Sequence, residues 1–230
     1  MGTQLSRLWS TSIVKKQLVA ITGLAMVGFL VAHLAGNLLI FGGPEALNGY
    51  SEMLHKVPEV LWIMRLGLLA ALVVHVYFTA LLTHENRAAR AVRYEVQADF
   101  GRTNFAKRTM ILTGLLVFFF LWIHLANFAF AAKEGPHTAV TAAGTQELGL
   151  FGLVWNKFLN PVYALFYILA VGCVGFHLSH GIQSLLQTIG FNHERYTPMI
   201  RKAAIGAGIA LACGFASVPV YVMVKRVPGL

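Results

Sequence analysis

Long uninterrupted apolar runs are the feature that most constrains the fold of this chain. A run of about 20 apolar residues is needed for a helix to cross a hydrocarbon core of about 30 Å, and several runs here reach that length. Only 12% of the residues are charged and 57% are hydrophobic, whereas a soluble domain is roughly 25% charged. The runs are too long and too continuous for the short alternating strands of a barrel. We therefore predict an all-α integral membrane protein.

The ends of the runs give the expected helices. We predict one transmembrane domain over residues 1–230, with five spans at about residues 17–41, 61–83, 109–131, 161–186 and 203–224. The first run is too long for a cleaved signal peptide, so we read it as a retained span. The segments between the spans are expected to be loops, one of mixed charge after span one and one rich in Gly and Thr after span three.

The basic residues predict the orientation. If the N-terminus is cytoplasmic, the inside segments collect twelve of the 18 Lys and Arg residues, which fits the positive-inside rule. These residues are Arg7, Lys15, Lys16, Arg87, Arg90, Arg93, Arg102, Lys107, Arg108, Arg195, Arg201 and Lys202. The net charge of +9 is concentrated at helix ends rather than on an interleaved binding surface, which argues against nucleic acid as a partner. The chain is expected in a prokaryotic cytoplasmic (inner) membrane with its C-terminus outside.

The stretch from Gly172 to Ser184 is the least typical part of a membrane span. It places His177 and His180 inside an apolar run and surrounds them with Gly172, Gly175 and Gly181. Glycines beside a buried imidazole make room for a flat group. We take haem as the working hypothesis; the chain has no C-x-x-C-H motif for covalent attachment.

Four histidines, one on each of the first four spans, sort into two depths. At 1.5 Å per residue, His33 lies about 25 Å from the cytoplasmic edge and His124 about 24 Å. His75 lies about 14 Å from that edge, and His177 lies about 24 Å from the outer edge, in the inner half. The depths predict an outer pair, His33 with His124, and an inner pair, His75 with His177.

Depth-matched pairs suggest two bis-histidine haems stacked across the membrane. We expect the first four helices to form a di-haem four-helix bundle, with the fifth helix peripheral. Small residues would admit the macrocycles: Gly28, Gly36, Gly67, Ala70, Ala71, Gly114, Gly172 and Gly175. A single membrane histidine is often only an interhelical hydrogen-bond partner, and a set of them can form a proton relay in a haem-free transporter. The absence of Asp and Glu from the predicted spans argues against the relay.

Two further groups of residues are left open. His180 follows His177 by about 60° around the helix and could replace it as ligand or contact a haem propionate. On the outer side, Glu52, His55 and Glu59 are a candidate quinone or proton site, since a quinol oxidised there must release protons.

These motifs resemble the cytochrome b subunit of succinate:quinone oxidoreductases, the group of succinate dehydrogenase and fumarate reductase, in its five-helix di-haem form. The likeness covers nearly the whole chain. It rests on His-Leu-x-Gly-Asn at residues 33–37, Leu-x-x-x-His ending at His75, Ile-His-Leu at His124, and Phe-His-Leu-Ser-His-Gly at residues 176–181.

The resemblance implies two haem b groups. His33 and His124 would ligate the distal haem, and His75 and His177 the proximal haem, with His177 favoured over His180 by the His-x-x-x-Gly pattern. It also implies a flavoprotein with FAD and an iron–sulfur subunit as cytoplasmic partners, menaquinone as the favoured quinone, and a dimer of heterotrimers. As an enzyme subunit, the chain would react with quinone and bind no dicarboxylate. Some fumarate-reducing members carry a transmembrane glutamate two residues before the fourth ligand, which is proposed as a proton route. The residue at that position here is Gly175, so this proton route is not expected. A cytochrome b anchor of another respiratory enzyme is the nearest alternative.

Overall fold

The computed structural model describes residues 11–89, 105–131, 138–140 and 146–225. Arg7, Arg90, Arg93 and Arg102, which contribute to the predicted charge bias, lie outside these residues. The elements are α2 (Ser12–Leu38), the 3-10 helix η1 (Leu39–Gly42), α3 (Pro44–His55), α4 (Pro58–Ala88), α5 (Phe105–His124), the π-helix η2 (Leu125–Ala129), β1 (Thr138–Val140), β2 (Gln146–Leu148), α6 (Leu150–Leu159), α7 (Pro161–Thr188) and α8 (Thr197–Lys225).

The five predicted spans are confirmed. Among the described residues, five helices are long and apolar enough to cross a membrane, namely α2, α4, α5 with η2, α7 and α8. Several of these helices extend beyond the predicted apolar spans. Helix α4 covers residues 58–88 instead of 61–83, because Pro58 fits the first helical turn and polar residues that favour helix continue its C-terminal end. Asn160 caps α7, its side chain accepting a hydrogen bond from the Val162 backbone N–H at 2.9 Å.

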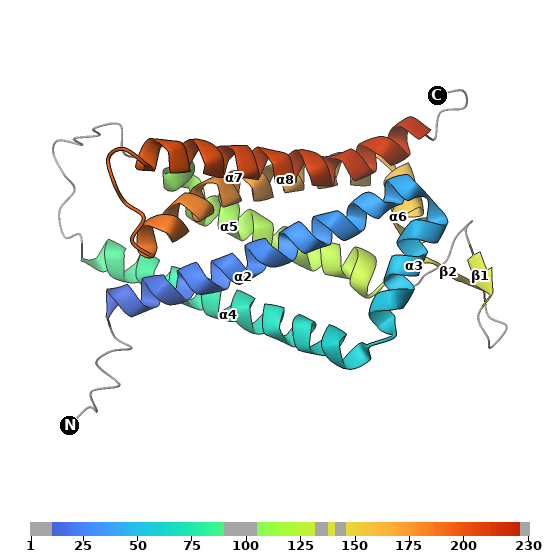
Figure 1. Ribbon diagram of the computed structural model, residues 1–230, viewed down its shortest axis with the longest axis horizontal. Coiled ribbons are helices and arrows are strands. Elements are labelled where there is room, and N and C mark those ends of the chain that lie inside the picture. The colour runs from blue at the N-terminus through green and yellow to red at the C-terminus, as the bar shows by residue number, and fades with distance from the viewer. Residues whose placement is uncertain (1–10, 90–104, 132–137, 141–145, 226–230) are drawn as a thin grey trace.

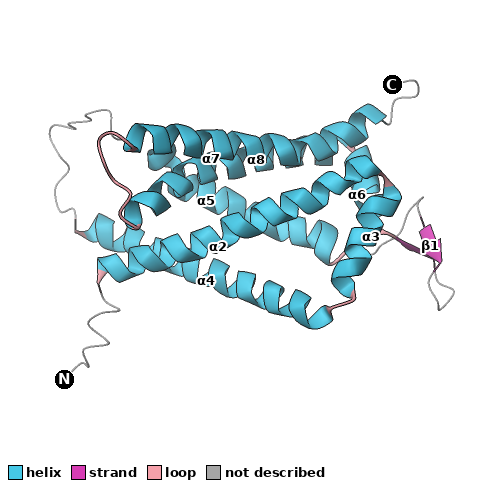
Figure 2. Cartoon of the chain, in the orientation of Figure 1, coloured by secondary structure: helices cyan, strands magenta, loops and turns pink. Residues whose placement is uncertain are grey.

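Two segments that we predicted as loops contain short helices, so that prediction is wrong. Gly43, with φ of 87°, turns the chain after η1, and Pro44 then starts α3. The second segment holds the hairpin β1–β2 and the apolar helix α6. Both helices are too short to span a bilayer. A hydrogen bond connects α3 to α6: the Oδ1 atom of Asn48 on α3 accepts from the Phe151 backbone N–H of α6 at 2.9 Å. Apart from the β1–β2 hairpin, Figure 2 shows the described chain as helices and short connections.

The long helices contact one another in the spatial order α4, α2, α7, α5. Over the described residues, α4 and α5 share no extended backbone contact, so the closed four-helix bundle stays a prediction. Helix α8 packs along α7 and also contacts α2 and α6. In Figure 1 it runs along the side of the molecule opposite α4, the peripheral place expected for the fifth span.

Glycines allow α7 and α8 to approach closely. A Cβ on Gly175 would overlap the Gly208 carbonyl oxygen and lie 2.8 Å from the Ala212 Cβ. A Cβ on Gly208 would lie 3.1 Å from that of Ser179. Membrane helices associate through such small residues because lipid offers no hydrophobic driving force between them. Gly175 is therefore used for helix packing, and its predicted role beside a cofactor is wrong.

A salt bridge ties the ends of α2 and α4 together on the predicted cytoplasmic side. The Lys15 ammonium pairs with the Glu85 carboxylate, and Lys15 is 6% exposed. Helix α4 has no fully buried residue of its own. The ion pair and the α2 contact therefore determine where α4 lies.

The glycine contact gives a stability prediction. Gly175→Ala should lower the thermal midpoint of the purified protein, because overpacking of this kind costs about 1 to 3 kcal/mol. Gly206→Ala on α8 is the control, since its Cβ would meet nothing within 4 Å, and it should leave the midpoint unchanged or raised. Equal midpoints for the two variants would contradict close packing at Gly175.

Candidate functional site

The four intramembrane histidines lie on the four helices α2, α4, α5 and α7. Each predicted pair joins helices that share no extended backbone contact in the described chain, α2 with α5 and α4 with α7. In the outer pair, the His33 and His124 side chains bridge the space between α2 and α5. This is the arrangement in which two side chains can hold one group between them.

The outer pair is in contact. The ring centroids of His33 and His124 lie 5.8 Å apart, with the ring planes at 86°. Two metal–imidazole bonds of about 2 Å in line would place the centroids roughly 6 Å apart, so the observed spacing is compatible with one metal ion between the rings. The Nδ1 atom of His124 is buried and has no hydrogen-bond partner among the described residues.

Aromatic rings enclose the outer pair. Phe29 stacks on His33 with centroids 5.2 Å apart, and Phe128 lies 5.4 Å from His124. Tyr167 lies 6.1 Å from His124, and its hydroxyl oxygen accepts a hydrogen bond from Asn127 Nδ2 at 3.1 Å. The π-helix η2 begins directly after His124. Such π segments are frequent at functional sites.

The inner pair is held by hydrogen bonds. His75 Nδ1 lies 3.1 Å from the Val19 carbonyl oxygen and 3.3 Å from Thr22 Oγ1. A carbonyl can only accept, so Nδ1 carries the proton and donates it. The Thr22 hydroxyl itself donates to the Leu18 carbonyl at 2.7 Å, which leaves its oxygen free to accept.

His177 is held in the same way from α5. Its Nδ1 lies 3.1 Å from Thr113 Oγ1, and that hydroxyl donates to the Met110 carbonyl at 3.0 Å. The oxygen of that hydroxyl can then accept a hydrogen bond from Nδ1–H of His177. Both imidazoles have Nδ1 anchored, and the tautomer with Nε2 unprotonated, which a metal ligand needs, is compatible with both sets of contacts.

A glycine follows each of these threonines and lies beneath the same imidazole. A Cβ on Gly23 would be 3.3 Å from His75 Cε1, and one on Gly114 would be 3.4 Å from His177 Cε1. Gly114 was predicted to admit a macrocycle; here it makes room for the imidazole. Gly28, Gly67 and Gly172, by contrast, would have nothing within 4 Å of an added Cβ.

Neither threonine was predicted as a site residue, although the sequence carries a signal for both. Thr-Gly-Leu at residues 22–24 is followed by His-Leu-Ala at 33–35, and Thr-Gly-Leu at 113–115 by His-Leu-Ala at 124–126. The spacing is the same in both copies. Each copy supplies one outer histidine and, about three helical turns before it, the threonine and glycine that support an inner histidine.

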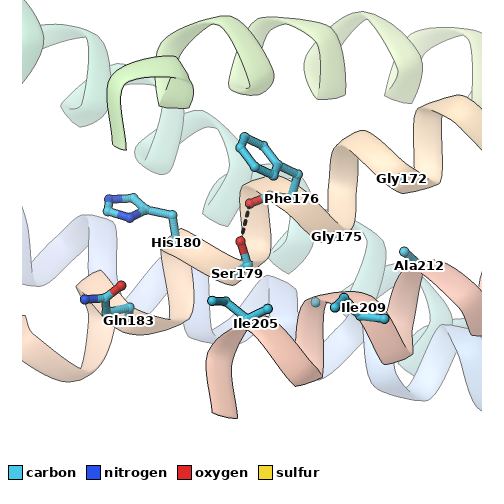
Figure 3. A pocket seen from close by; sticks show the side chains of 10 residues that line it. Gly172, Gly175, Phe176, Ser179, His180, Gln183, Ile205, Ile209 and Ala212 are labelled. Atoms are coloured by element: carbon cyan, nitrogen blue, oxygen red, sulfur yellow. Dashed lines mark hydrogen bonds between the residues drawn. The ribbon is translucent and has the colours of Figure 1, made fainter. Parts of the chain in front are cut away.

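His180 lies apart from the inner hydrogen bonds. It is half-buried and lines a groove between α7 and α8 with Ser179 and Gln183 (Figure 3). His177, and not His180, is bonded to Thr113 of α5. A role of His180 as alternative ligand or propionate contact stays a prediction.

The predicted outer quinone or proton site is not assembled into one cluster. Glu52 and His55 lie on α3 and Glu59 in the first turn of α4, and all three are exposed. The His55 ring Nδ1 lies 2.7 Å from the Ser51 carbonyl oxygen, to which it donates. No hydrogen bond or salt bridge among the described side chains links the three residues.

Gly36 is also used differently from the prediction. It was expected beside a haem, but it packs against the ring of Tyr50 on α3. A Cβ on Gly36 would lie 2.6 Å from Tyr50 Cε1. The absence of a side chain here therefore admits the Tyr50 ring, and the predicted role of Gly36 is wrong.

The donor set bears on which group would fit. Within the described ranges, no cluster of three or more His, Cys, Asp or Glu side chains could hold a metal ion alone. Two facing imidazoles can complete the coordination only of a metal that brings its remaining ligands with it. An iron porphyrin is such a group, because the macrocycle supplies four nitrogen ligands and leaves two axial positions. The outer histidine pair therefore offers the two donors that such a group requires.

The fold and the paired histidines define an α-helical multi-pass membrane protein with a candidate cofactor site in its interior. No protein-family model, curated protein or solved structure matches the chain significantly. The likeness to a cytochrome b subunit therefore stays a prediction from the motifs.

The hydrogen bond from His177 gives a prediction for the site. Thr113→Val removes the acceptor and leaves a buried N–H unpaired, which should destabilise the protein by about 1 to 3 kcal/mol. Thr113→Ser keeps the hydroxyl and should restore most of that loss. Thermal unfolding of the two variants and the natural chain measures the difference; equal losses in both variants would contradict a role for the hydroxyl.

Proposed function

We propose that the chain is a di-haem cytochrome b that transfers electrons across part of the membrane. The observations that support the proposal are the contact of His33 with His124 across helices that share no extended backbone contact and the anchoring of both inner Nδ1 atoms. Neutral imidazole in hydrocarbon is costly and normally faces a partner. A pair of axial ligands gives each of these histidines a partner.

Each group of residues has its own role in this proposal. His33 and His124 hold the outer haem, and His75 and His177 hold the inner one. When bound, each haem supplies a one-electron redox centre. Thr22, the Val19 carbonyl and Thr113 orient the inner imidazoles, and such partners also raise ligand basicity. The rings around the outer pair exclude water.

The same proposal extends to the assembly. By its motifs, the chain is the membrane anchor of a succinate dehydrogenase or fumarate reductase in a prokaryotic inner membrane. It would pass electrons between an iron–sulfur subunit and a quinone, menaquinone being favoured. The dicarboxylate chemistry would take place on a flavoprotein with FAD. A flavoprotein that copurifies with the chain would separate this anchor from that of another respiratory enzyme.

Haem content tests the proposal. The purified chain or complex should contain two haem b groups per polypeptide in a pyridine haemochrome assay. His33→Ala and His75→Ala should each lose about one of them, because an axial ligand is removed. His84→Ala is the control, since His84 is exposed at the end of α4, and it should keep both.

Two results would contradict the proposal. A folded chain without haem would leave a proton relay or interhelical hydrogen bonding as the role of the four histidines. Equal haem loss in the control and in the His33 and His75 variants would show that the loss reflects unfolding rather than ligation.

A further inference from the structure

A groove of about 420 Å³ runs between α7 and α8, away from the paired histidines. Gly172, Gly175, Ala212 and Gly208 line one part, and Ser179, His180 and Gln183 line the other (Figure 3). Ile205 and Ile209 of α8 form an apolar wall and are 40% and 58% exposed. The groove thus has an apolar part and a polar part along one axis.

The length of the groove matches one leaflet of a bilayer. Gly172 and Gln183 lie eleven residues apart on α7, which corresponds to about 16 Å along the helix. Half of a hydrocarbon core is about 15 Å. By the charge distribution, the end of α7 beyond Gln183 is cytoplasmic. The groove therefore extends from the middle of the membrane to the cytoplasmic interface, and its polar part lies at the interface.

Positive charge lies at the cytoplasmic mouth of the groove. Arg201 precedes the wall residues Ile205 and Ile209 by four and eight positions, so all three share one face of α8. Arg195 and Lys202 are also exposed near this end, where Glu194 is the carboxylate among the described residues of the α7–α8 connection. The mouth carries a net positive charge directly above an apolar channel.

We propose that this groove binds an anionic phospholipid of the cytoplasmic leaflet. One acyl chain lies along Gly172 and Gly175 against Ile205 and Ile209, and the phosphate lies at Arg201. Basic residues where transmembrane helices meet the cytoplasmic interface attract anionic head groups in this way. A quinone would fit the flat glycine surface, but it has no anionic group for Arg201. The proposal does not rest on the four proposed ligands His33, His75, His124 and His177, which do not line the groove.

The charge contact is tested by lipid retention. The full chain, with any subunits that copurify, is extracted in mild detergent and examined by native mass spectrometry with added phosphatidylglycerol or phosphatidylcholine. The natural chain should retain phosphatidylglycerol in preference to phosphatidylcholine. Arg201→Gln should weaken that retention about fivefold, the effect of one cation near the head group. Lys202→Gln also removes one positive charge, but at a position about 100° around the helix from Arg201. It should weaken the retention of phosphatidylglycerol less than twofold.

The acyl contact is tested by filling the groove. Gly172→Leu should be tolerated by the fold, because a Cβ there meets nothing within 4 Å, and should displace the bound lipid. Gly206→Leu, equally open but absent from the lining of the groove, is the control and should retain it. Thermal midpoints and haem content of all variants show whether the fold and the proposed haem sites are intact.

Three outcomes would overturn the proposal. The first is equal retention of phosphatidylglycerol and phosphatidylcholine by the natural chain. The second is equal effects of the Arg201 and Lys202 substitutions or of the two leucine substitutions. The third is retention of a menaquinone analogue, and no phospholipid, that Gly172→Leu abolishes.

Discussion

The cost of burying imidazole in hydrocarbon is the constraint on which the structure of this protein depends. A polar ring within an apolar span needs a partner, and four helices here each carry one such ring. The inner rings use Nδ1 to bond Val19 and Thr22 on α2 and Thr113 on α5. The outer rings meet each other inside an aromatic enclosure. The outer contact links α2 and α5, which share no extended backbone contact, while the inner hydrogen bonds join neighbouring helices, α4 to α2 and α7 to α5.

The chain achieves this by using one helical pattern twice. Helices α2 and α5 each present a threonine and a glycine to an inner histidine and, ten residues after the glycine, an outer histidine. Each is followed by a short helix, α3 or α6, before the next span, and these short helices contact each other. The first four spans are therefore two similar halves that face each other, while α8 packs on α7 and α2 through close glycine contacts.

Depth along the membrane could be predicted from the sequence, because helix rise is constant. The five spans and the meeting of His33 with His124 followed from it. Rotation of each helix about its axis could not be predicted. For this reason Thr22 and Thr113 were missed, and Gly36 and Gly175, which pack against Tyr50 and Gly208, were expected beside a cofactor. The helices α3 and α6 were taken as loops because runs of ten to twelve residues give no span signal.

We propose that the two histidine pairs ligate two haem irons. Low-temperature electron paramagnetic resonance of the oxidised, purified protein tests it most directly, because the signal reports the axial ligands of each ferric iron. We expect two distinct low-spin signals of bis-imidazole type. High-spin ferric signals, or no ferric signal from protein that is shown to be folded, would contradict it.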